Sequence, residues 1–313
     1  MSTRALTRQV AERGTFRWKK LSSYTPYLFI APLIILILTF TFYPVISGAK
    51  MSLTDAAGIN PGEWVGFNNF KEVIQFEEFQ KALFHTFYFM IGCFITQIPC
   101  AFILAYILNN VAKRLRGILR ASFFVPVLIN SVIVALIFRV MFNRDQGIVN
   151  WFMGLLHLPN NIDWIMTESL CIPLMIIAAF WQWTGYHMVY FLAQLQTIDA
   201  SIYESAKLDG ASPARVLWSI ITPMMRPAFT FVMVTSGIGA LMQFEYAYLI
   251  FYQASFGPNL GALTALAFIW RHGFSQNFRL GFATAASWIL FAIIFIFSVI
   301  QVRMIGLGKS NEE

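Results

Sequence analysis

The side chains best suited to chemistry are polar groups inside otherwise apolar stretches. Residues 180–190 read FWQWTGYHMVY, and residues 235–246 read TSGIGALMQFEY. A polar or charged group at membrane depth is costly unless it faces a cavity or a partner helix. Amides and hydroxyls can satisfy the hydrogen bonds of a neutral, hydroxyl-rich solute, while aromatic rings cover its C–H faces. The alternative reading is interhelical hydrogen bonding, in which small and polar residues let helices approach closely.

The candidate residues for a solute pathway come from three stretches. Two of these stretches place polar residues at intervals of three or four, so the residues of each set are predicted to share one helix face. Tyr246 follows Gln243 by three residues and is predicted to lie on the same face. In the third stretch, Pro126 frees a backbone carbonyl and is expected to bend its helix. Glu245 is the only acid within the apolar stretches. The predicted pathway residues are Asn130, Ser131, Gln182, Trp183, Tyr186, Tyr190, Ser236, Gly239, Gln243 and Glu245.

Sequence patterns typical of enzymes are missing. The chain has no GxxxxGK[ST] phosphate loop, so it is not expected to bind and split ATP by that route, and it has no GxSxG or HExxH pattern. Its four histidines are scattered, and its three cysteines show neither metal-ligand spacing nor a disulfide framework. We therefore expect neither an enzyme nor a metal site. The chain is expected to let a solute pass through the membrane, to sense a signal or to take part in an assembly.

Composition identifies an integral membrane protein. Of 313 residues, 58% are hydrophobic and 12% charged, and the mean hydropathy is +0.64. Soluble domains carry about 25% charged residues. The net charge of +7 does not indicate nucleic acid binding, because the basic residues lie at the edges of apolar segments. The basic N-terminus resembles a signal peptide, but its apolar run, from Tyr27 to about Ala49, is too long, so we interpret it as a retained first span.

The apolar pattern predicts an all-α protein with six transmembrane helices. A cytoplasmic segment 1–26 precedes a six-span domain, 27–303, and a cytoplasmic tail, 304–313, follows it. Of the 22 Lys and Arg residues, 15 fall on the side of both termini and of the loop between spans four and five. The positive-inside rule therefore places that side in the cytoplasm. The predicted spans are about 27–49, 84–108, 121–142, 170–193, 228–251 and 281–303.

The polar interlude 199–227 is predicted to form cytoplasmic helices between spans four and five. Asp199 is a candidate N-cap for a helix ending near Leu208, and Gly210 supplies the turn that follows. Ser212 followed by Pro213 predicts a second helix, with a capping hydroxyl and proline at its first position. Its apolar side would comprise Val216, Leu217, Ile220 and Ile221, and Pro223 and Pro227 would end or bend it. A capped helix–turn–helix of this kind is suited to contact another protein.

This interlude resembles the cytoplasmic "EAA" loop of permease subunits of binding-protein-dependent ABC importers. Ser205 replaces the family's usual first alanine, a small-for-small change. The resemblance extends over nearly the whole chain, through segments 42–44, 66–70, 120–126, 142–147, 256–258 and 281–286, and is greatest to the first permease of maltose- or glycerol-phosphate-type sugar importers. The matching loop residues are Glu204, Ser205, Ala206, Asp209, Gly210, Ala211, Pro223 and either Ile220 or Ile221.

The resemblance implies a role and partners. It implies a multi-pass subunit of the bacterial inner membrane that forms half of a carbohydrate pathway and pairs with a second, homologous permease. Two ATP-binding cassette subunits would bind ATP and Mg²⁺ and dock on the EAA-type loop, an external solute-binding protein would deliver the sugar, and no cofactor is expected in this chain. By the same analogy, the pathway includes Ser131, Trp183, Tyr186, Ser236 and Gln243.

Two other classes of protein remain as alternatives. A secondary transporter or channel without ATPases would call for paired intramembrane charges or inverted repeats, whereas the spans hold a lone acid, Glu245. A membrane sensor or assembly scaffold would not need polar span faces. Aromatic and amide groups favour a neutral mono- or oligosaccharide. Arg139 and Arg271 at span ends leave an acidic sugar or sugar phosphate open.

Overall fold

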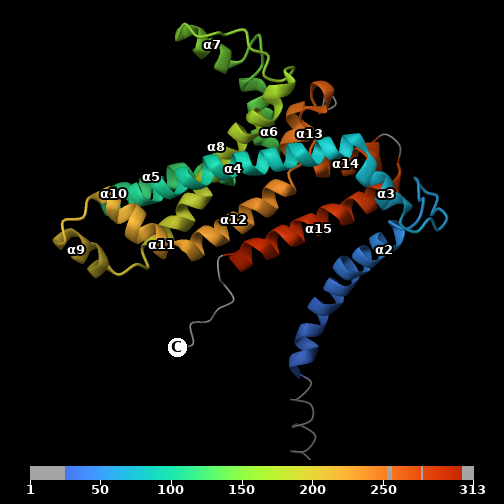
Figure 1. Ribbon diagram of the computed structural model, residues 1–313, viewed down its shortest axis with the longest axis horizontal. Coiled ribbons are helices and arrows are strands. Elements are labelled where there is room, and N and C mark those ends of the chain that lie inside the picture. Colours follow the sequence, from blue (N-terminus) through green and yellow to red (C-terminus); the bar gives the residue numbers. More distant parts are fainter. Residues whose placement is uncertain (1–24, 252–255, 276–277, 305–313) are drawn as a thin grey trace, which may run out of the picture.

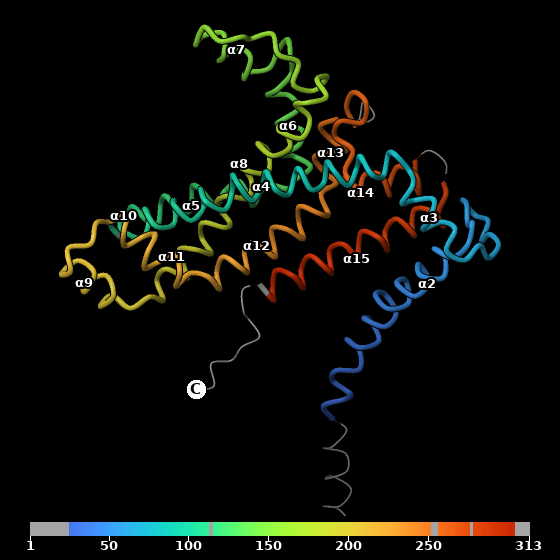
Figure 2. Tube along the Cα trace, viewed as in Figure 1, coloured from blue at the N-terminus to red at the C-terminus, as the bar shows by residue number. Residues whose placement is uncertain are grey.

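The computed structural model describes residues 25–251, 256–275 and 278–304, and these ranges are built largely from helices (Figures 1 and 2). The first helix, Thr25–Met51, includes a π-helical stretch, η1 (Leu38–Phe42), and ends as α2 (Tyr43–Met51). The remaining elements are α3 (Asn68–Gln75), α4 (Glu77–Asn109), α5 (Lys113–Leu128), α6 (Ser131–Met141), α7 (Ile148–Leu155), α8 (Glu168–Leu195), α9 (Ala200–Leu208), α10 (Pro213–Arg215), η2 (Val216–Ile221), α11 (Thr222–Met224), α12 (Arg226–Leu241), α13 (Glu245–Phe251), η4 (Pro258–Leu260), α14 (Ala265–Trp270), η5 (Arg271–Ser275) and α15 (Leu280–Met304).

Four of these helices are long and apolar enough to cross a membrane: Thr25–Met51, α4, α8 and α15. Two further pairs qualify only as bent spans, α5 with α6 and the segment Pro213–Met224 with α12. Counting each bent pair as one span gives six. The helical architecture with several helices of spanning length, predicted from the sequence, is therefore present.

The third predicted span, 121–142, is not one straight helix. α5 and α6 meet at 92°, three residues beyond Pro126. Asn130 begins α6 as its N-cap, because its side chain accepts a hydrogen bond from the N–H of Val132 at 2.8 Å. Pro126 lies inside α5, which continues to Leu128, so the bend comes after the proline and not on its N-terminal side, where a proline kink is expected. α6 and α7 turn away from the long helices (Figure 1).

The sequence predicted the fifth span, 228–251, as one helix, and this prediction is wrong. α12 ends at Leu241, and α13 begins at Glu245 after a short non-helical break. The Thr264 hydroxyl donates to the carbonyl of Gln243 at 2.7 Å. Because a side chain from a distant segment satisfies this backbone group, the break is tolerated inside the bundle. Gln243 and Tyr246 consequently do not continue the helix face of Ser236 and Gly239, as the regular spacing had predicted.

The side chains pack in two apolar clusters along the bundle. One contains the N-terminal parts of α4 and α8 together with α13, α14 and α15. The other contains the C-terminal parts of α4 and α8 with α9, η2 and α12. In Figure 1, α3 lies at the end of the bundle near the first cluster and α9 at the opposite end. The first helix leaves the bundle at the α3 end, and most of its side chains are exposed.

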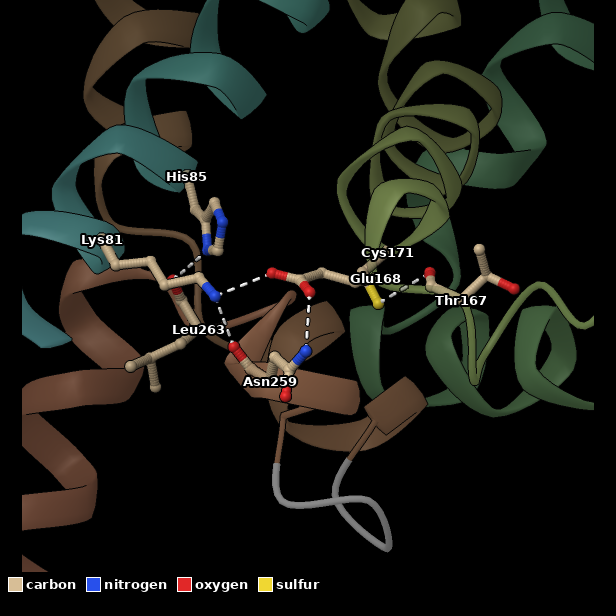
Figure 3. A network of polar contacts seen from close by, with 7 residues as sticks. All are labelled: Lys81, His85, Thr167, Glu168, Cys171, Asn259 and Leu263. Atoms are coloured by element: carbon tan, nitrogen blue, oxygen red, sulfur yellow. Dashed lines mark hydrogen bonds and ion pairs between the residues drawn. The ribbon is translucent and has the colours of Figure 1, made fainter.

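Ion pairs tie the chain together at the α3 end. Lys81 of α4 lies 2.7 Å from Glu168 at the start of α8, and its ammonium also donates to the backbone carbonyl of Asn259 at 2.6 Å (Figure 3). The Asn259 amide completes the triangle by donating to Glu168 at 2.9 Å. Glu72 of α3 forms a two-point ion pair with Arg279 just before α15. Segments far apart in sequence are thus fixed to one another at this end.

Candidate functional site

A cavity of about 630 Å³ lies among α4, α8, α12 and the break that follows α12. Its size is within the range of small-molecule sites. Apolar residues form much of its wall, and hydroxyl, amide, imidazole and indole groups interrupt them. The lining residues are Phe89, Cys93, Gln97, Ser131, Ala179, Trp183, Tyr186, His187, Thr235, Ser236, Gly239, Ala240, Met242, Gln243, Glu245 and Leu266.

Most of the residues that the sequence suggested for a pathway line this one cavity. Trp183 and Tyr186 lie one helical turn apart on α8, with their rings edge to face at 6.1 Å. They are 37% and 38% exposed, so a solute can reach both rings. The candidates that line the cavity are Ser131, Trp183, Tyr186, Ser236, Gly239, Gln243 and Glu245.

Gln182 lies in the packing behind the wall. Its side chain is 1% exposed. Its amide nitrogen donates to the backbone carbonyl of Ile129 at 2.8 Å, and its amide oxygen accepts from the hydroxyl of Tyr246. The carbonyl of Ile129 is at the bend between α5 and α6, and Tyr246 is on the short helix after the second break. Gln182 therefore joins the two discontinuous spans, as the interhelical alternative proposed.

Asn130 and Tyr190 are also absent from the cavity wall. The Asn130 side chain is used as the N-cap of α6. The ring of Tyr190 stacks on that of Phe231 in α12, with centroids 4.5 Å apart and planes 19° apart. A role in local structure accounts for the position of each.

Gln243 and Glu245 bring polar atoms to the cavity from the break itself. The hydrogen-bonding pattern is satisfied when the amide oxygen of Gln243 accepts from the N–H of Tyr246 at 2.9 Å and from that of Glu245 at 3.3 Å. In that orientation the oxygen is occupied, and the amide NH₂ is left as a donor. The Glu245 carboxylate is exposed beside it. An adjacent donor and acceptor can bind neighbouring hydroxyls of one solute.

Three polar residues of the wall, Gln97, His187 and Thr235, are not among the residues predicted from the sequence. His187 is 4% exposed, and its Nδ1 has no hydrogen-bond partner within the described ranges. The sequence carried a usable signal for it, because an imidazole at membrane depth indicates a functional position. Metal-ligand spacing, which His187 lacks, is a different signal and does not reveal it.

The loop at the opposite end has the predicted helices and caps. The Asp199 side chain accepts from the N–H of Ser201 at 2.8 Å at the start of α9, and this hydrogen bond holds the pKa of the Asp199 carboxyl below its usual value. Gly210 follows α9 with φ +71°, and the N–H of Ala211 donates to the carbonyl of Ala206 at 3.0 Å. Together with the bond from Gly210 to Lys207, this forms a Schellman turn, which strongly favours glycine at the left-handed position.

The second loop helix is anchored to the bundle by its apolar side. The Ser212 hydroxyl accepts from the N–H of Arg215 at 3.3 Å, with Pro213 at the first helical position. Val216, Leu217 and Ile221 are buried in the same cluster as Ala206. The segment then bends by 70° at Met225. This residue lies between Pro223 and Pro227, where the sequence predicted an end or a bend. These features of the predicted loop are confirmed.

One side of the loop stays uncovered by this chain. Glu204, Ser205, Asp209 and Gly210 are exposed, while Ala206 between them is 5% exposed and packs inward. Leu208 at the end of α9 is 89% exposed. The loop is therefore fixed on its inner side and presents polar groups and a leucine outward.

The fold and site define a multi-span membrane protein. It has a cavity of solute size among α4, α8 and α12 and an anchored polar loop at the α9 end of the bundle. The chain belongs to the family of binding-protein-dependent transport system inner membrane components, whose family model matches residues 97–305. It is therefore a multi-pass subunit of ABC importers.

Characterised relatives extend the similarity to nearly the whole chain. The arabinooligosaccharides transport system permease protein AraP of Bacillus subtilis is 31% identical over 308 residues, 97% of this chain and 95% of that protein. The lactose transport system permease protein LacF of Rhizobium radiobacter is 32% identical over 276 residues, 88% of this chain and 92% of that protein. A chain of the bacterial alginate ABC transporter, solved in complex with alginate pentasaccharide-bound periplasmic protein, has the same fold, with a TM-score of 0.80 and 23% identity over 92% of this chain and 96% of that one.

Proposed function

We propose that this chain is the permease subunit of an ATP-driven importer and forms half of the pathway for a mono- or oligosaccharide. The observation that carries the proposal is the cavity, where indole, phenol, amide and hydroxyl groups from separate helices meet. This mixture suits a carbohydrate, since rings cover sugar C–H faces and polar groups bind hydroxyls. The named substrates of AraP and LacF, arabinooligosaccharides and lactose, support the same class.

The proposed assembly follows the family. A second permease would complete the pathway, two ATPase subunits would bind ATP and Mg²⁺ in the cytoplasm, and a periplasmic binding protein would deliver the sugar. The complex between the alginate transporter and its periplasmic protein supports the last of these. Charge distribution supports the orientation, with both termini and the loop 199–227 in the cytoplasm.

The loop would couple the ATPases to the spans. α9 would dock in a groove of an ATPase subunit, with Glu204 and Asp209 contacting donor groups there. Because Ala206, Val216 and Ile221 are buried in the bundle, a displacement of the loop moves the C-terminal parts of α4 and α8 with it. ATP-driven closure of the ATPases would in this way change the bundle from inward-open to outward-open.

Substitution of Gly210 tests the coupling. A Cβ on Gly210 meets no atom within 4 Å, but its φ of +71° is unfavourable for other residues. Gly210→Trp should remain in the membrane, lose co-purification with the ATPase and abolish sugar uptake. Gly117→Trp is the control, because a Cβ there also meets no atom and the backbone is helical. Normal uptake by Gly210→Trp contradicts the docking proposal.

Substitutions in the cavity test the pathway separately. Trp183→Ala and Gln243→Ala should lower uptake or change sugar preference while assembly with the partner permease and ATPase is retained. If neither variant changes transport, these residues only pack. Co-purification also separates the proposal from an ATPase-independent transporter or channel, which would bring down neither a second permease nor an ATPase.

A further inference from the structure

The charge of the cavity wall points to the kind of sugar. Glu245 is the one carboxylate residue among the described lining residues, and it is exposed. Within the described part of the chain, no lysine or arginine lines the cavity. His187, the one imidazole among the described lining residues, is 4% exposed. The wall is therefore polar with a negative charge.

The two arginines that could have served an acidic sugar lie elsewhere. Arg271 is held by Glu78, 3.1 Å away, and is absent from the cavity wall. Arg139 of α6 is absent from the wall as well. Proteins bind carboxylates chiefly through the paired donors of arginine or the ammonium group of lysine. This half of the pathway offers neither.

We propose that the cavity accepts neutral saccharides and rejects acidic ones, and that Glu245 is the residue that rejects them. A sugar carboxylate would meet the Glu245 carboxylate in a space partly shielded from water, where repulsion between like charges is strong. A neutral sugar instead donates its hydroxyls to that carboxylate in charge-assisted bonds. The neighbouring Gln243 amide donates to another hydroxyl. This inference rests on the proposed function in carbohydrate transport.

A binding experiment on the membrane complex tests the selection apart from the external binding protein. The permease, its partner permease and the ATPases are purified together. Saturation-transfer NMR then measures binding of two probes, a neutral disaccharide and the same disaccharide with one C6 hydroxymethyl group oxidised to a carboxylate. Wild type should bind the neutral probe at least about tenfold more tightly. Glu245→Gln should reduce this ratio by about tenfold through tighter binding of the acidic probe.

Glu63→Gln is the matched control, because it removes the same charge from an exposed position outside the cavity. It should leave the ratio unchanged. Equal binding of both probes by wild type, or an unchanged ratio in Glu245→Gln, overturns the inference and leaves sugar transport intact. If neither probe binds and the complete importer takes up neither sugar, the proposed function fails and the inference fails with it.

Discussion

At the scale of single residues, Gln182 shows how one side chain can hold two broken spans. Its amide satisfies the carbonyl of Ile129 at the first bend and the hydroxyl of Tyr246 beyond the second break. A buried polar group that loses its partner costs about 1–3 kcal/mol. The sequence placed Gln182 in the pathway because it shares a helical spacing with Trp183 and Tyr186, but spacing alone does not say which polar residue finds a protein partner.

Replacing Gln182 by leucine should therefore lower stability more than it alters sugar preference. Gln182→Leu removes the amide that bonds the Ile129 carbonyl and the Tyr246 hydroxyl, and we expect a loss of about 1–3 kcal/mol. Tyr246→Phe removes the hydroxyl alone. Because the two residues share a bond, the double variant should lose less than the sum of the single losses. Thermal unfolding of the purified proteins measures this, and simple additivity would contradict the described bond.

His272 lies in η5, just before α15, and its protonation should make stability depend on pH. It is 3% exposed among the rings of Phe76, Phe268 and Phe282, and its Nε2 lies 3.3 Å from Glu78. Burial lowers its pKa from the usual 6.5, while the hydrogen bond to Glu78 opposes that shift and Arg271 and Arg279 add to it. The folded protein therefore takes up a proton less readily than the unfolded chain.

Stability should consequently be fully present above pH 6.5 and fall as the pH drops from 6.5 towards the lowered pKa of the folded state. Melting temperatures measured between pH 7.5 and 5.5 test this. His272→Phe should reduce the pH dependence, since phenylalanine suits the surrounding rings and does not titrate. An equal slope in both proteins would show that other groups cause the effect.

At the scale of elements, a close contact between α5 and α8 positions the first bend. A Cβ built on Gly185 of α8 would overlap the backbone carbonyl of Phe123 in α5. Gly185→Ala should force these helices apart and cost about 1–3 kcal/mol through overpacking. Gly239→Ala is the control, because nothing lies within 4 Å of its Cβ and alanine favours helix. Comparable melting temperatures for both variants would contradict the close contact.

The sequence predicted elements whose signals are local. The helix starts at Asp199 and Ser212 and the turn at Gly210 follow from capping and from a positive φ, and neighbouring residues determine all three. The break after Leu241 could not be predicted in this way, because no proline or glycine lies between Leu241 and Glu245 to mark it. Its partner, the Thr264 hydroxyl, comes from a segment 21 residues away.

At the scale of the whole molecule, the polar contacts at the α3 end lie at the opposite end of the bundle from α9 (Figure 1). Lys81, Glu168 and Asn259 belong to three segments that meet only in the folded bundle (Figure 3). Lys81 and Glu168 are 35% and 42% exposed, so water and salt screen their attraction. An ion pair of this exposure contributes about 0.2–1 kcal/mol. The ion pair therefore adds a small contribution to an end of the bundle that is packed by the first apolar cluster.

A double-mutant cycle on this pair tests that description. Lys81→Ala and Glu168→Ala should each lower the melting temperature, and their coupling should be about 0.2–1 kcal/mol and decrease at high salt. The exchanged pair, Lys81→Glu with Glu168→Lys, should restore only part of the stability. The reason is that the new carboxylate at position 81 would face the carbonyl of Asn259, which now accepts from Lys81. Full restoration would show that the attraction of the two charges alone matters. The contact with Asn259 would then contribute nothing to the stability of this end of the bundle.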